Sequence, residues 1–132
     1  MLNGFREQTQ QLNDYELNTL LPIVIRGLET KIGRENAITN VSIVRGMRAH
    51  GRQINEPRVR KIINYIRTNN LVPLLIATSE GYYVAKTVDE LDDYIDSLAG
   101  RERAIREVRI SLERQKEKYM RKPANTLPLF QD

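Results

Sequence analysis

The chain has 132 residues, of which 29% are charged and 40% hydrophobic, and this composition predicts one small folded domain with an arm or tail. It contains no cysteine, which excludes disulfide bonds, thiolate metal sites and thiol catalysis. Its one histidine cannot form a metal site alone, and no phosphate-binding glycine loop is present, so we expect neither an enzyme nor a bound metal or cofactor.

The net charge of +4 is unevenly distributed along the chain. Residues 45–67 carry seven basic residues and one acid, and residues 101–122 carry nine basic residues and four acids. Residues 86–96, between these two segments, carry five acids. A surface that only has to be soluble mixes its charges more evenly. We therefore expect basic surfaces that meet a polyanion.

The first predicted elements are an arm and a helix. Residues 1–12 are polar and are expected to form a flexible arm. A helix is predicted to begin at Asn13 or Asp14, either of which can cap it, and to end at Gly33. Pro22 lies inside this helical pattern, where it predicts a kink or two short helices that abut.

Two further helices are predicted before residue 70. The second helix is capped by Thr39 or Asn40, ends at His50–Gly51 and directs an apolar side inward, including Val41. The third begins near Pro57, because the fixed φ of proline suits a first turn, and it ends at Asn69–Asn70. Its apolar residues recur at helical spacing and predict a buried stripe: Val59, Ile62, Ile63 and Ile66.

A β-hairpin and a long helix are predicted next. Apolar runs at residues 74–77 and 82–85 enclose a turn that contains Gly81, which is typical of a hairpin. Thr87 and Glu90 fit a capping box that starts a helical pattern extending as far as Arg121 and interrupted only at Gly100. Five of its residues lie seven positions apart in a partial coiled-coil pattern: Leu91, Leu98, Ile105, Leu112 and Tyr119. This pattern favours a homodimer through Leu91–Tyr119. The alternatives are that the basic helix extends the DNA-binding surface, or that it is a solvated helix whose Glu and Arg residues pair with one another.

These elements predict a mainly α fold with a small β-hairpin (α+β), arranged as a winged helix-turn-helix and followed by a long C-terminal helix. The expected boundaries are 13–99 for the winged helix-turn-helix domain, 100–122 for the basic helix and 123–132 for a flexible tail. In such a domain the third helix can enter the major groove of double-stranded DNA. The expected DNA-binding residues are Arg45, Arg48, Arg52, Pro57, Arg58, Arg60, Lys61, Asn64, Tyr65, Thr68 and Ser79.

The alternative interpretation of this helix is a solvated face whose charges pair with one another. The acids needed for such pairs are nearly absent from residues 45–67, so we favour nucleic acid. The hairpin carries Glu80 at its tip, so we expect its contribution to DNA binding to be weak or to come from Ser79, Thr78 and main-chain amides.

Residues 35–114 also resemble winged-helix proteins common in bacteriophages and integrated mobile elements. The resemblance rests on residues 36–40, 59–67, 79–83 and 94–98. It implies a DNA-binding role in replication or transcription control of a mobile element. Similar proteins often have Lys at the tip of the wing, where this chain has Glu80.

The end of the chain suggests a second function. Residues 126–130 resemble the short motif by which bacterial replication and repair proteins dock on the sliding clamp, with Thr126 in place of the usual Gln. The alternative to DNA binding is therefore an adaptor of the replication machinery that binds a partner through Leu127, Leu129 and Phe130, while RNA binding ranks third. Residues 1–11 are too polar for a signal peptide and no run approaches transmembrane length, so we expect no membrane partner and a location in the cytoplasm of a bacterium or a phage-infected host.

Overall fold

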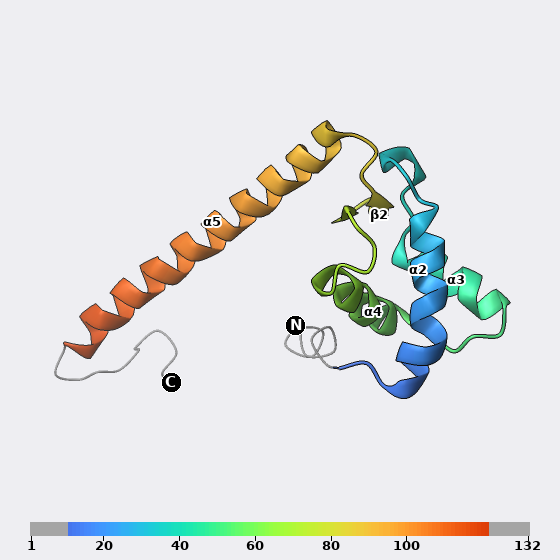
Figure 1. Ribbon diagram of the computed structural model, residues 1–132. Helices are drawn as coiled ribbons and strands as arrows, with labels where there is room; N and C mark the ends of the chain where they lie inside the picture. Colours follow the sequence, from blue (N-terminus) through green and yellow to red (C-terminus); the bar gives the residue numbers. More distant parts are fainter. Residues whose placement is uncertain (1–10, 122–132) are drawn as a thin grey trace. The chain divides into compact units, whose positions relative to one another are not determined.

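The computed structural model describes residues 11–121, which are mainly helical and include one small antiparallel hairpin and a long C-terminal helix (Figure 1). This confirms the predicted mainly α class with a small β-hairpin and a long C-terminal helix. The chain divides into two units, Met1–Asp92 and Asp93–Asp132, which are described in turn. The elements in chain order are η1 (Glu16–Leu20), α2 (Leu21–Glu29), η2 (Arg34–Asn36), α3 (Asn40–Ala49), α4 (Glu56–Thr68), β1 (Leu75–Thr78), β2 (Gly81–Val84) and α5 (Val88–Met120).

The first helical stretch contains a widened turn just before Pro22. Asn13 precedes this stretch, and η1, which is a π-helix, continues directly into α2. The backbone N–H of Leu21 donates to the carbonyl of Glu16, five residues earlier, which is the π-helical pattern. Pro22 is one of the first residues of α2. The interruption expected at this proline is thus a π-helical turn that leads into α2.

Helices α3 and α4 begin at side-chain caps and are joined by residues 50–55. The Thr39 hydroxyl accepts a hydrogen bond from Ser42 N at 3.2 Å, and the Asn55 side chain accepts one from Arg58 N at 2.9 Å. Gly51 follows α3 with φ +77°, a conformation that glycine adopts without strain. Both helix starts therefore agree with the sequence within one residue.

The core of the first unit is built around α4. All four predicted residues of its stripe are at most 3% exposed, and they pack in one apolar cluster with residues of η1, α2 and α3 such as Leu20 and Leu28. Ile43 and Met47 are the buried residues of α3, whereas Val41, which the sequence placed inward, is 47% exposed. The buried side of α3 is thus narrower than predicted. Helix α4 is held in the core by its own apolar stripe.

The hairpin is held against the segment between α2 and α3. Strands β1 and β2 pair antiparallel, and Tyr82 of β2 also exchanges two backbone hydrogen bonds with Ile38, of 2.8 and 3.0 Å. Gly81 has φ +123°, and a Cβ at this position would lie 2.5 Å from the carbonyl oxygen of Ile38. Glycine is therefore required here by both its φ and the close approach of another backbone.

Helix α5 spans 33 residues without a break at Gly100. The Thr87 hydroxyl accepts a hydrogen bond from Glu90 N at 3.1 Å, which confirms the predicted cap. The Glu90 carboxylate in turn accepts hydrogen bonds from Lys86 N and from Arg34 N of η2. Within residues 11–121, no helix combines the length and apolar composition that a membrane crossing needs.

Candidate nucleic-acid interface

The Glu16 carboxylate, at the start of the first helix, both caps this helix and binds cations of α4. Asn13 accepts a hydrogen bond from Glu16 N at 2.8 Å, and the Glu16 carboxylate reaches back to accept one from Asn13 N at 2.9 Å. This reciprocal pair is a capping box, in which an asparagine replaces the usual serine or threonine. The box fixes the Glu16 side chain, which is only 3% exposed.

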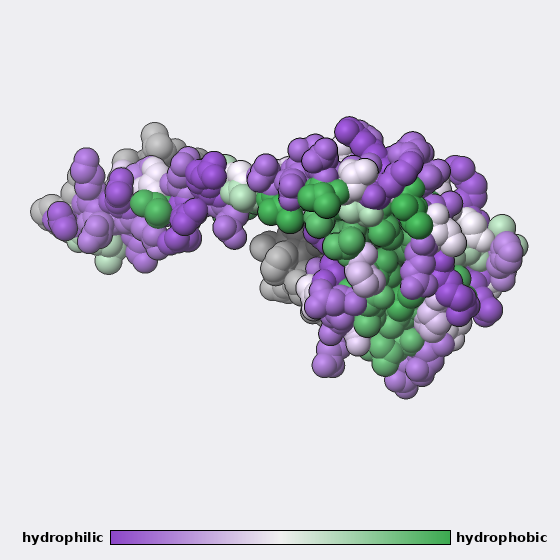
Figure 2. Space-filling model, turned by 45° about the horizontal axis from the view of Figure 1, so that its top comes forward, coloured by the Kyte–Doolittle hydropathy of each residue, from purple (hydrophilic) through white to green (hydrophobic). Residues whose placement is uncertain are grey.

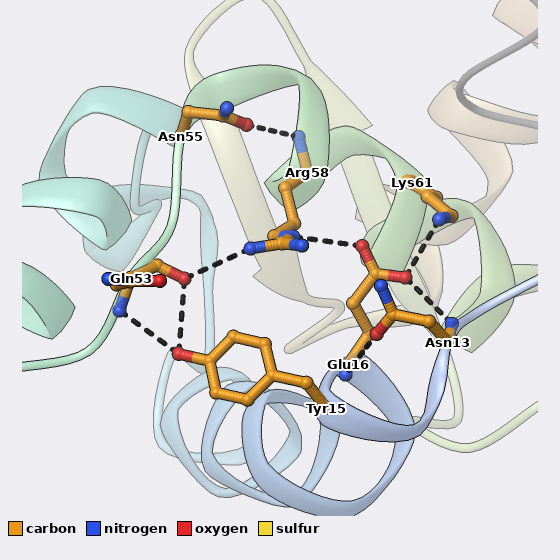
Figure 3. A network of polar contacts seen from close by, with 7 residues as sticks. All are labelled: Asn13, Tyr15, Glu16, Gln53, Asn55, Arg58 and Lys61. Atoms are coloured by element: carbon orange, nitrogen blue, oxygen red, sulfur yellow. Dashed lines mark hydrogen bonds and ion pairs between the residues drawn. The ribbon is translucent and has the colours of Figure 1, made fainter.

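The same carboxylate binds two cations of α4. Glu16 Oε2 lies 2.9 Å from Arg58 Nε, and Glu16 Oε1 lies 2.7 Å from Lys61 Nζ (Figure 3). The side chains of Arg58 and Lys61 are 30% and 12% exposed. One buried negative charge therefore faces two partly buried positive charges, and this group keeps a net charge of +1.

These contacts lower the pKa of the Glu16 carboxyl. Burial alone would raise this pKa, because it disfavours the charged form. The hydrogen bonds from Lys61, Asn13 N and Arg58 outweigh burial, so the pKa of Glu16 lies below its ordinary value. The carboxylate is consequently ionised at neutral pH and ties the first helix to α4.

A second set of contacts links the first helix to the connection between α3 and α4. The Tyr15 hydroxyl accepts a hydrogen bond from Gln53 N at 3.0 Å and donates one to Gln53 O at 3.1 Å. The Arg58 guanidinium lies over the Tyr15 ring, 5.3 Å from its centroid (Figure 3). Arg58 is thus held both by a carboxylate and by an aromatic face.

These contacts correct the sequence-based view of α4. We expected its outward face to lack acidic partners, and this is wrong for Arg58 and Lys61. Their partner, Glu16, lies 42 and 45 residues earlier in the chain, outside the segment whose charges were compared. The capping pattern of Asn13 with Glu16 three residues later was visible in the sequence, but its contact with α4 depends on tertiary packing.

The other cations of the predicted interface have fewer contacts with acidic side chains. Arg45 and Arg52 are exposed, and neither forms an ion pair with another residue in the range 11–121. Arg60 lies 3.9 Å from Glu56, a long contact between two exposed side chains that contributes little. Arg48 donates from Nε to the carbonyl of Ile54 at 2.9 Å, so it also holds the connection between α3 and α4.

The remaining predicted positions are uncharged. Thr68 is exposed, and its hydroxyl donates to the carbonyl of Asn64 in its own helix at 2.9 Å. Ser79 is exposed in the turn of the hairpin. Three others are partly buried along α4: Pro57, Asn64 and Tyr65.

The acid at the tip of the hairpin is paired. Glu80 forms an ion pair with Arg34 of η2, including a contact of 2.9 Å from Arg34 Nε, and this hydrogen bond lowers the pKa of Glu80. The pair leaves no net charge at the tip. Repulsion between Glu80 and a phosphate is therefore weaker than the sequence indicated, although the tip still offers no free cation of its own.

An apolar groove of about 410 Å³ lies between α2 and α3 in the first unit. Its lining includes Gly27 of α2 and Gly46 of α3, and a Cβ at either glycine would meet no other atom within 4 Å. Figure 2 shows a band of apolar residues across one face of this unit, with polar residues on both sides. Over residues 11–121, no group of three or more histidine and acidic side chains is placed to hold a metal ion.

The proposed clamp-docking residues Leu127, Leu129 and Phe130 lie outside the described residues, so docking on a sliding clamp stays a prediction. Comparison of the chain with protein-family models, with curated proteins and with solved structures gave no significant match. The resemblance to winged-helix proteins of phages and mobile elements is therefore also a prediction still.

Proposed function

We propose that this chain is a DNA-binding protein of winged helix-turn-helix type, with α4 as the helix that enters the major groove. The order α2, α3, α4 and hairpin is typical of that fold, and so is the pairing of β2 with both β1 and the segment before α3. In this arrangement the hairpin forms the wing.

The observation that carries the proposal is a surplus of arginines with a weak acidic partner or none, on α3, on α4 and on the connection between these helices. Arg45 and Arg52 have no carboxylate partner among residues 11–121, and Arg60 has only the long contact with Glu56. Exposed cations without acids nearby create a positive potential that attracts phosphates. We assign these three arginines to the DNA backbone.

The structure changes the roles we assign along α4. Lys61 and Arg58 serve mainly to neutralise Glu16 and to fix the angle at which α4 meets the first helix. Asn64 and Thr68 are the polar side chains we assign to the groove, because asparagine can bond to adenine and threonine to either base edge. The positioning residues thus lie in the first half of α4, and the residues assigned to base contacts lie in its second half.

A fluorescence-anisotropy titration with labelled duplex DNA tests this proposal. The three phosphates neutralised by these arginines predict a log-log slope of affinity against salt of roughly −3 per protomer. Arg45→Ala and Arg52→Ala should each weaken binding to all sequences alike, and Arg26→Ala, which removes an exposed charge from α2, is the matched control. A flat salt response, or equal losses for all three variants, would contradict the proposal.

A further inference from the structure

Helix α5 carries an apolar stripe that the described residues, 11–121, leave exposed. Ile105, Val108 and Leu112 are 71%, 61% and 57% exposed and follow one another at spacings of three and four residues. Leu98 and Tyr119 continue the same side of the helix at sevenfold spacing. Figure 2 shows the rest of this helix as largely hydrophilic. This spacing is that of a coiled-coil seam.

A helix of this kind gains stability from a partner. Between residues 98 and 120 no side chain of α5 is buried, so tertiary packing contributes little to this part of the helix. In proteins, most of the stability of a helix comes from the packing of its apolar face against other residues. Covering three large aliphatic side chains on each of two helices would stabilise both.

The charges along α5 indicate the direction in which two such helices would pair. The first turns carry Asp89, Asp92, Asp93 and Asp96 and no basic residue, whereas residues 114–121 carry four basic residues and one acid. A parallel pair would place acid beside acid and base beside base. An antiparallel pair places the acidic end of one helix beside the basic end of the other.

We propose that α5 pairs with α5 of a second copy of this chain as an antiparallel coiled coil. The register in which the apolar stripes of the two helices overlap most fully places Ile105 of one copy against Val108 of the second copy. It also places Leu98 opposite Gln115 of the second copy.

The charged residues beside the seam select this register. Glu102 then faces Arg109 of the second copy, twice in each dimer. A shift of one heptad in either direction would instead bring Glu102 beside Glu102 or Arg109 beside Arg109 of the two copies. In the single chain Arg109 lies 2.9 Å from Glu113, but both side chains are exposed. Replacing this contact with one to Glu102 of the second copy therefore costs little free energy.

The mass of the full-length chain in solution tests the pairing. Sedimentation equilibrium should give twice the chain mass of 15.3 kDa, with a fraction of monomer that grows on dilution. Ile105→Asp should raise the dissociation constant roughly a hundredfold or more, because each dimer loses two buried isoleucine side chains. Ile110→Asp, the same change on the opposite side of α5, is the control and should leave the mass unchanged. A monomer at all concentrations would overturn the proposal.

Cross-linking tests the direction, since the chain has no native cysteine. The variants Leu98→Cys and Gln115→Cys, treated with a short bis-maleimide, should each give little cross-linked product alone and abundant product when mixed. In the antiparallel pair the two copies of residue 98 are about 25 Å apart along the helix. Efficient cross-linking of each variant with itself would show a parallel pair and overturn the proposed direction. Neither experiment contains DNA, so both are independent of the proposed function.

Discussion

The Nζ atom of Lys61 lies 2.7 Å from Oε1 of Glu16, a carboxylate that also caps the first helix and binds Arg58. A single side chain therefore joins the start of the first helix to the first two turns of α4. Such a junction determines the angle of α4, and with it the direction in which the exposed residues of α4 point. The ion pairs of Glu16 are costly to break, because a charged group that loses its partner would remain partly buried and unpaired.

Replacing Glu16 with Gln should destabilise the fold by about 2–3 kcal/mol, since Arg58 and Lys61 lose the charge that compensates them. The expected loss of stability is smaller than for a fully buried ion pair, because the side chain of Arg58 is 30% exposed. Urea unfolding followed by circular dichroism measures the change. Glu29→Gln, at the exposed end of α2, is the matched control and should stay within about 0.5 kcal/mol of the parent. Equal effects of the two variants would argue against the role of Glu16.

The stability contributed by Glu16 should disappear in acid. Its pKa is lowered in the folded chain, so between the folded and unfolded pKa values the unfolded chain binds more protons and stability rises with pH. The contribution is complete above the ordinary pKa of a glutamate and is lost as the pH falls through the lowered value. The pKa values of Glu80 and Glu90 are also lowered, so the parent must be compared with Glu16→Gln. The difference in unfolding free energy between the two should shrink towards acid pH, and a constant difference would contradict this prediction.

Two glycine substitutions should have opposite effects. Gly81→Ala should destabilise the fold by about 3 kcal/mol, because φ is +123° and the new Cβ would meet the carbonyl oxygen of Ile38. Gly46→Ala, inside α3 with open space around the new methyl group, should stabilise it by about 0.5–1 kcal/mol. Thermal unfolding of both variants provides the measurement. Similar melting temperatures for the pair would show that the backbone contact between Gly81 and Ile38 is unimportant.

Lys61 and Arg52 should differ in what their removal costs. Lys61→Met should lower stability by about 1–2 kcal/mol and change DNA affinity by less than about twofold, because this lysine is engaged with Glu16 and Arg58 still ties Glu16 to α4. Arg52→Ala should leave stability within about 0.5 kcal/mol and weaken DNA binding several-fold. Unfolding and anisotropy titrations on the same preparations separate the two effects. A greater loss of DNA affinity for Lys61→Met would restore the role that the sequence assigned to this residue.

The local elements of this protein were determined by the sequence itself. Thr39, Asn55 and Thr87 cap the helices that follow them, and the isoleucine-rich stripe of α4 is buried as its spacing predicts. These features depend on residues within a few positions of one another, so their physical causes can be found in short windows of sequence. The class of fold followed from their order.

The partners of individual charged residues were decided only by the tertiary structure. Glu16 meets Arg58 and Lys61, and Glu80 meets Arg34, across 42, 45 and 46 positions of the chain. Counting charges in a segment cannot detect such pairs, because the range of an ion pair is set by distance in space and not by separation along the chain. The sequence thus determined which side of α4 is buried, and the packing of the first helix against α4 decided which of its cations remain available.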